Sequence, residues 1–134
     1  MKTDSRLHHY AQNIAKGSLE NVLEMYKIFD CEVVYRPDNP PYQWAMVGQK
    51  QLHFVIQIVE VDEKPIAELD TKIKAHIAFI TDNPREIIGK VENWAKSKNI
   101  NFREGGWNEK ERYFDLPDLF VNFVVEVLHT SIED

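Results

Sequence analysis

Apolar residues recur at helical spacing in two stretches of the chain. In the first, Ser18 is a good N-cap residue and precedes an apolar stripe with charged residues on its other side. In the second, Asn83 can cap, Pro84 suits the first helical position, and Glu86 can reach back to the cap. The spacing therefore predicts two amphipathic helices. Their buried stripes are Leu19, Val22, Leu23, Tyr26 and Phe29, and Ile87, Ile88, Val91, Trp94 and Ala95.

Segments rich in β-branched and aromatic residues surround each helix and predict strands. Proline, glycine, asparagine and aspartate separate these segments, as is typical of loops and turns. The charged stretch 62–71 contains Pro65 and is predicted to be a linker, and residues 104–106 are predicted to form a turn. The predicted strands cover residues 7–14, 31–36, 44–47, 52–61, 73–80, 100–103, 111–116 and 119–129.

Each half of the chain thus has the order strand, helix, strand, strand, strand. A half of this size could scarcely bury its own helix and sheet face, whereas two halves packed together could. The sequence therefore predicts an α+β fold of two paired βαβββ modules in one domain, residues 1–134. Module one covers about residues 1–66 and module two about residues 70–134.

Charge and cysteine content narrow the partners and the compartment. Asp and Glu number 22 against 16 Lys and Arg, a net charge of -6, and no basic cluster is present, which argues against nucleic acid as a partner. Cys31 is the single cysteine, so no intrachain disulfide can form and we expect a cytoplasmic protein. Neither a signal peptide nor an apolar run of the roughly 20 residues that a membrane helix needs is found, so we expect no membrane partner.

Three histidines and one glutamate fall at related positions in the two halves. His9 and His76 lie on the first predicted strand of each half, and His53 and Glu126 lie on the last. Pseudo-two-fold packing of the halves would bring these four residues together. Imidazoles with one carboxylate suit Zn, Ni, Co, Mn or Fe, so we predict one divalent metal ion bound by them. Two alternatives stay open: His8 in place of His9, and Glu126 as an outward-facing edge residue.

Four segments resemble the glyoxalase/bleomycin-resistance/dioxygenase (vicinal oxygen chelate) superfamily. Residues 75–84, Ala-His-Ile-Ala-Phe-Ile-Thr-Asp-Asn-Pro, are similar to the His-Ile-Ala-Phe-x-Val-Asp-Asp strand of that family. Residues 7–10 resemble its opening strand, 51–56 its fourth strand, and 115–127 its closing segment. The resemblance implies a sheet-lined cup with helices outside and a homodimer. It also implies a small-molecule substrate chelated through adjacent oxygens.

The resemblance implies one of two functions. The first is a metal-dependent lyase, isomerase or dioxygenase in which Glu126, or else His53, moves the proton. The second is a metal-free protein that sequesters a drug-like ligand, for which the acidic charge would suit a cationic guest. Strand aromatics more often pack in a core, and Arg103 beside Glu104 is more often a surface pair. The candidate substrate-binding residues of the predicted cup are Trp44, Met46, Gln57, Arg103, Trp107 and Tyr113.

Overall fold

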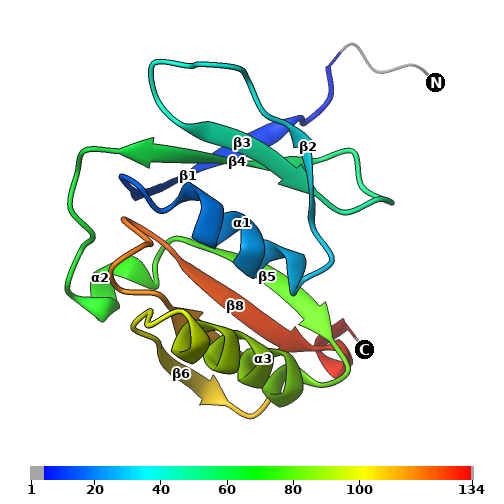
Figure 1. Ribbon diagram of the computed structural model, residues 1–134. Helices are drawn as coiled ribbons and strands as arrows, with labels where there is room; N and C mark the ends of the chain where they lie inside the picture. Colours follow the sequence, from blue (N-terminus) through cyan, green and yellow to red (C-terminus); the bar gives the residue numbers. More distant parts are fainter. Residues whose placement is uncertain (1–4, 134) are drawn as a thin grey trace.

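A computed structural model describes residues 5–133 as two four-stranded sheets with three α-helices and a terminal 3-10 turn (Figure 1). The predicted α+β class and the strand–helix–strand–strand–strand order of each half are confirmed. The strands are β1 (His9–Ala15), β2 (Glu32–Tyr35), β3 (Trp44–Gly48), β4 (Val55–Val61), β5 (His76–Thr81), β6 (Arg103–Asn108), β7 (Glu111–Asp115) and β8 (Val124–His129). The helices are α1 (Leu19–Lys27), α2 (Leu69–Lys72), α3 (Pro84–Ser97) and the 3-10 turn η1 (Thr130–Glu133).

The two sheets repeat one topology. Sheet A has the order β1-β4-β3-β2 and sheet B the order β5-β8-β7-β6. In each sheet the first strand is parallel to the last, and the other pairs are antiparallel. The register is repeated too, because His9 pairs with Val55 in sheet A and His76 pairs with Val124 in sheet B. His9 and His76 are therefore equivalent positions of the two halves.

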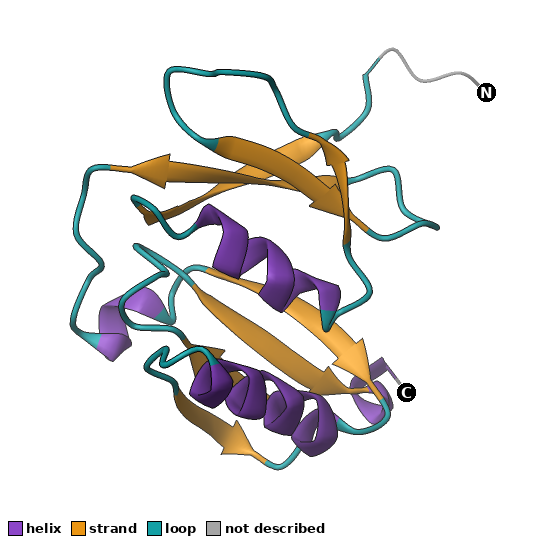
Figure 2. Cartoon of the chain, viewed as in Figure 1, coloured by secondary structure: helices purple, strands orange, loops and turns teal. Residues whose placement is uncertain are grey.

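Helix α1 lies between the two sheets (Figures 1 and 2). On one side, the hydroxyl of Tyr26 donates a hydrogen bond to Gln12 of β1. On the other side, the ring of Phe29, just past the helix, stacks on Phe79 of β5 with centroids 4.4 Å apart. Helix α3 packs on β8 of sheet B. The helices thus cover one face of each sheet, and the other face of each sheet is turned away from α1.

The two main helices start differently. Helix α3 begins as predicted: the Asn83 side chain accepts a hydrogen bond from the Glu86 backbone N–H at 3.3 Å, and Pro84 follows the cap. Helix α1 starts after Ser18, but the Ser18 hydroxyl makes no capping bond. The buried carboxylate of Glu60, on β4, accepts the Leu19 N–H at 2.9 Å instead. The cap of α1 is therefore tertiary, and local sequence could not indicate it.

Several predicted boundaries were wrong: for example, β5 begins at His76 rather than at 73, and the end of the predicted linker 62–71 lies in α2. Residues 104–106, predicted as a turn, lie inside β6, and the turn is at residues 109–110. The last strand begins at Val124 rather than at 119, because Phe120 is buried in the preceding loop, stacked on Phe123. Strand β4 begins at Val55 rather than at 52, which leaves His53 in the turn before it. A buried apolar run does not by itself distinguish a strand from a packed loop.

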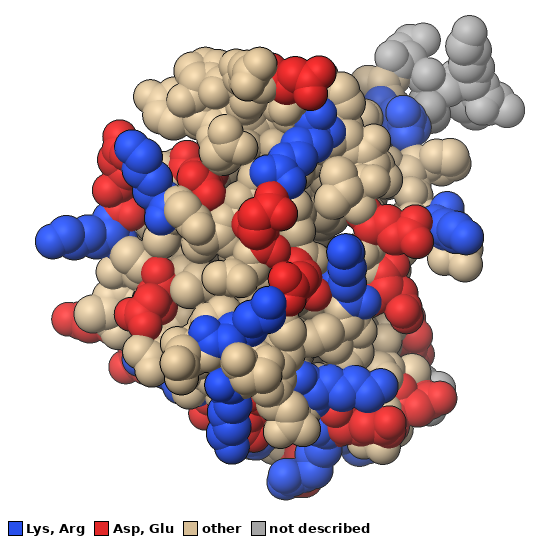
Figure 3. Space-filling view, in the orientation of Figure 1, with Lys and Arg blue, Asp and Glu red and all other residues tan. Residues whose placement is uncertain are grey.

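Charge is mixed over the surface. On the side of the molecule in Figure 3, acidic and basic side chains are interspersed without a large patch of one sign. Among residues 5–133 there is no helix with both the length and the apolar content needed to cross a bilayer.

We expect Phe29→Ala to weaken the packing between α1 and sheet B. The ring is buried and stacks on both Phe79 and Phe114, so its removal should lower the free energy of unfolding by about 3–5 kcal/mol. Urea denaturation followed by circular dichroism measures the change. Leu52→Ala is the control: Leu52 is 59% exposed and should change stability by less than about 0.5 kcal/mol. Equal losses of stability in the two variants would contradict a role of Phe29 in the packing between α1 and sheet B.

Candidate functional site

Two predicted ligands meet on the outer face of sheet B. Along β5, Ile77 and Phe79 are turned toward the helical core, and strand alternation turns His76 to the opposite face. Along β8, the same alternation brings Glu126 to that face. His76 Nε2 lies 3.7 Å from Glu126 Oε1, with the side chains 36% and 14% exposed. We call this outer side of sheet B the Glu126 face.

A backbone carbonyl fixes the orientation of the His76 ring. His76 Nδ1 lies 2.9 Å from the carbonyl oxygen of Ile73. A carbonyl only accepts, so Nδ1 carries the hydrogen of this bond, which in the neutral ring leaves the lone pair on Nε2. That lone pair faces the carboxylate of Glu126, so a cation or another hydrogen-bond donor placed between the two acceptors would be stabilised. A metal-bound histidine has this arrangement, with its second nitrogen donating to a carbonyl.

His9 occupies the equivalent position on sheet A. Along β1, Gln12 and Ile14 are buried toward α1, whereas His9 is exposed on the opposite side. His8 precedes the strand, and its Nδ1 lies 2.8 Å from His9 Nδ1. Strand alternation therefore gives the outer position to His9 rather than to His8. We call this outer side of sheet A the His9 face.

The four predicted ligands do not converge within one chain. In residues 5–133 no group of three or more His, Cys, Asp or Glu side chains could hold a metal ion together. The reason is the position of α1, which contacts both sheets and so turns the His9 face and the Glu126 face away from it. One chain thus brings together His76 and Glu126, but neither His9 nor His53 joins them.

The register of the sheets identifies a residue that the sequence alone did not link to the ligands. Glu126 pairs with Ala78, two positions beyond His76. In sheet A the corresponding pair is Gln57 with Ala11, two positions beyond His9. Gln57 is therefore the equivalent of Glu126, whereas His53 lies in an exposed turn. His53 was predicted as a ligand because the strand was expected to begin at residue 52, but β4 begins at Val55. The pairing of Gln57 with Ala11 could be seen only in the structure.

The candidate substrate-binding residues divide between the two faces. Trp44 and Met46 of β3 alternate with buried Ala45 and Val47, and Met46 pairs with Gln57, so they share the His9 face. Tyr113 pairs with Glu126 on the Glu126 face. The ring of Trp107 lies 5.4 Å from that of Tyr113. Both faces therefore combine a candidate ligand with aromatic side chains.

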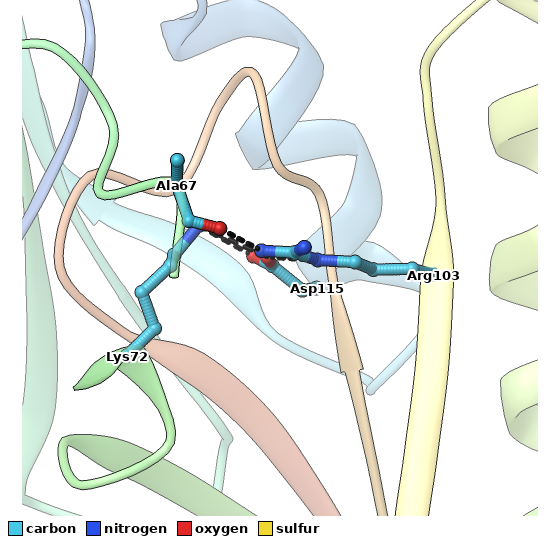
Figure 4. Close-up of polar contacts among 4 residues, drawn as sticks. All are labelled: Ala67, Lys72, Arg103 and Asp115. Carbon is cyan, nitrogen blue, oxygen red and sulfur yellow. Dashed lines mark hydrogen bonds and ion pairs between the residues drawn. The ribbon is translucent and has the colours of Figure 1, made fainter. Parts of the chain in front are cut away.

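The guanidinium of Arg103 is paired with the carboxylate of Asp115. Its Nε and Nη2 lie 2.9 and 2.8 Å from Asp115 Oδ2, and Nη2 also donates to the carbonyl of Ala67 at 3.3 Å (Figure 4). Lys72 Nζ, fully buried, binds the same carboxylate at 2.8 and 3.0 Å. Burial lowers the pKa of Lys72, against the carboxylate of Asp115, which raises it. The cluster ties α2 to sheet B, and the charged stretch 62–71 gave no sign that Lys72 would be buried.

A separate hollow of about 670 Å³ lies where α1 ends and β2 begins, and Lys27, Cys31 and Gln49 line it in part. The Cys31 thiol is buried, and desolvation raises its pKa to about 11. A thiol with that pKa is protonated at neutral pH and is a poor nucleophile. The hollow therefore carries no reactive group comparable with the His76–Glu126 pair.

Comparison with known proteins identifies solved structures that share the fold. No family model matches the sequence, and no curated protein matches it either. Among solved structures, the fosfomycin resistance protein FosX from Listeria monocytogenes, in complex with Mn(II) and a dihydroxypropylphosphonic acid, is similar with 18% identity and a TM-score of 0.60. That match covers 94% of this chain and 93% of FosX.

Two other solved structures have the same fold. The trypanothione-dependent glyoxalase I of Leishmania major is 14% identical with a TM-score of 0.65, over 97% of this chain and 90% of its own. TnmS3, an antibiotic binding protein from Streptomyces sp. CB03234, is 13% identical with a TM-score of 0.52, over 96% and 98%. The chain thus shares the fold of a fosfomycin resistance protein, a glyoxalase and an antibiotic binding protein, and the fold that the sequence resemblance implied is confirmed.

We expect Asp115→Ala to destabilise the protein strongly. It leaves Lys72 buried without its counter-charge, and breaking a buried ion pair in this way lowers the free energy of unfolding by about 3–5 kcal/mol. Arg103→Ala is the matched comparison, because Arg103 is 34% exposed and its loss should lower stability by about 1 kcal/mol. Chemical denaturation of both variants measures the difference, and an Arg103→Ala effect as large as that of Asp115→Ala would contradict it.

Proposed function

We propose that the protein is a metal-dependent enzyme of the glyoxalase type that holds one divalent ion at His76 and Glu126. The observation that supports it is the orientation of His76, whose Nδ1 is bonded to the Ile73 carbonyl and whose Nε2 faces the Glu126 carboxylate at 3.7 Å. Imidazole and carboxylate together suit Zn, Ni, Co, Mn or Fe. FosX, which shares the fold, was crystallised with Mn(II).

A second copy of the chain would complete the site. A pair of ligands binds a metal ion weakly, and catalytic sites commonly use three protein ligands. His9 is the equivalent of His76, but its face is turned away from the Glu126 face of the same chain. In a two-fold dimer, the His9 face of one copy can cover the Glu126 face of the other, and the symmetry creates two such sites. We therefore propose a homodimer with His9 as the third ligand and Gln57 or His53 as the fourth.

The residues present define what the site would do chemically. A bound divalent ion supplies Lewis-acid polarisation of adjacent substrate oxygens. Glu126 is the carboxylate of the site and is the proton carrier that we propose, with His53 as the second candidate. The reaction class is lyase, isomerase or dioxygenase, acting on a small molecule. We propose a cytoplasmic location, because the single cysteine can form no intrachain disulfide.

A second candidate function is metal-free binding of a drug-like molecule. Its support is the aromatic content of both faces, where Tyr35 and Trp44 lie 5.6 Å apart and Trp107 and Tyr113 lie 5.4 Å apart. TnmS3, with the same fold, is an antibiotic binding protein. Elemental analysis of protein purified without added metal separates the two functions, because only the first requires about one ion per chain.

We expect His76→Ala to remove most of the bound metal while the protein stays folded, since the side chain lies on an outer face and supports little of the core. Mass spectrometry of metals after dialysis measures the metal content, and circular dichroism measures the fold. His129→Ala is the control, because the His129 ring lies on the same sheet but is bonded to Ser131. A metal content unchanged by His76→Ala would rule out the proposed site.

Mixing two defective variants tests whether the site needs two chains. His9→Ala and His76→Ala should each lose metal as homodimers, but a mixed dimer keeps one site with both histidines. After unfolding and refolding of an equal mixture, we expect about one quarter of the wild-type metal content, because half of the dimers are mixed and each has one intact site. Light scattering should give twice the chain mass of 15.7 kDa. A mixture without metal, while wild-type protein binds it, would place the site within one chain.

A further inference from the structure

An aromatic pair lies next to the candidate ligands on the Glu126 face. The rings of Trp107 and Tyr113 are 5.4 Å apart at an interplanar angle of 63°. Tyr113 pairs directly with Glu126 across β7 and β8, and such partners have Cβ atoms about 5 Å apart. Trp107 is 56% exposed. An exposed indole beside a candidate metal ligand offers a surface on which a flat ligand can stack.

The backbone of β6 sets the position of both rings. Gly105 pairs with Tyr113, and a Cβ at Gly105 would lie 2.5 Å from Tyr113 Oη and 2.7 Å from its Cζ. A side chain at residue 105 would therefore displace the tyrosine ring from this position. The β6–β7 register shifts between Gly106 and Asn108, at Trp107. A bulge of this kind redirects a side chain, so a glycine and a bulge together shape the pair.

Charge on the two faces disfavours an anionic ligand. Among the strand residues that the structure describes on these faces, Arg103 is the one lysine or arginine, and Asp115 holds it through two bonds. Lys72, from α2, is fully buried on the same carboxylate. Glu111 and Glu126 add negative charge on the same side of sheet B. A phosphonate or carboxylate would meet this negative charge without a free lysine or arginine of these strands to offset it.

We propose that the Trp107–Tyr113 pair, positioned by Gly105, is a stacking platform that selects uncharged, planar aromatic ligands for the His76–Glu126 site. Binding of adjacent ligand oxygens by a metal ion rests on the proposed function. Stacking of the ligand on the two rings does not depend on that function. Gly105 is a positioning residue in this proposal, since it acts through Tyr113 rather than on the ligand.

Three probes with the same pair of adjacent hydroxyls test the selection. Naphthalene-2,3-diol is planar and uncharged, cyclohexane-1,2-diol is uncharged but not planar, and 6,7-dihydroxynaphthalene-2-sulfonate is planar but anionic. Isothermal titration of the wild-type protein, with and without Mn(II), should give naphthalene-2,3-diol an affinity about tenfold above both others. If naphthalene-2,3-diol binds most tightly but Mn(II) changes none of the three affinities, the proposed metal function is wrong and the stacking platform is supported. If naphthalene-2,3-diol shows no preference either with or without Mn(II), the platform is overturned.

Variants then assign the selection to the platform. Gly105→Ala should displace the Tyr113 ring and reduce the preference for naphthalene-2,3-diol about tenfold, whereas Tyr113→Phe keeps the ring and the preference. Trp94→Phe is the control, since this indole lies on α3 and is bonded to Glu24. Trp107→Ala changes an exposed side chain and tests the platform even if Gly105→Ala misfolds. The proposal would be overturned if the Trp107→Ala protein kept its preference for naphthalene-2,3-diol. It would also be overturned if this variant dissociated to monomers while its affinity for naphthalene-2,3-diol stayed unchanged.

Discussion

Helix α1 packs against both sheets at once, and this contact turns the His9 face and the Glu126 face away from each other (Figure 1). Tyr26 is bonded to Gln12 of sheet A, and Phe29 stacks on Phe79 of sheet B. A sheet that buries one face against helices has its other face left for solvent, ligand or a second chain. The two outer faces therefore point away from α1. Within one chain, His76 and Glu126 lie on one of these faces and His9 lies on the other.

The internal repeat is visible in the pairing of strands more than in the sequence. His9 and His76 open equivalent strands with equivalent partners, and Gln57 stands where Glu126 stands in the other half. The two halves are not chemically equal, because only sheet B has a carboxylate at that position. Proteins of this fold include an Mn(II)-bound fosfomycin resistance protein, a glyoxalase and an antibiotic binding protein. The fold alone therefore does not determine the chemistry, and the side chains on the outer faces must.

One candidate substrate-binding residue has a buried carboxylate as its partner. Arg103 was a candidate for substrate binding, but Asp115 and the Ala67 carbonyl hold it, and Lys72 shares the carboxylate. A buried carboxylate needs such partners, because an unpaired charge in the interior is costly. Through Ala67 and Lys72 the cluster holds α2 and the residue stretch before it on sheet B.

Local patterns of the sequence determined the main elements. Helical spacing and the Asn83–Pro84 start identified α3, and the repeated order of strands identified the α+β class with two modules. Period-two alternation was enough to put His76 and Glu126 on one side of a sheet, because their apolar neighbours must face the core. These features depend on residues close together in the chain, which is why they could be read from it.

Only the tertiary structure decided how the elements meet. The Glu60 cap of α1, the burial of Lys72, and the equivalence of Gln57 with Glu126 each join residues far apart in the chain. The turn predicted at 104–106 became part of β6, where Gly105 makes room for the Tyr113 ring. The pairing of β5 with β8 brings His76 close to Glu126, and the packing of α1 between the sheets separates His9 from both (Figure 1). Long-range packing of this kind has no signature in a local pattern of residues.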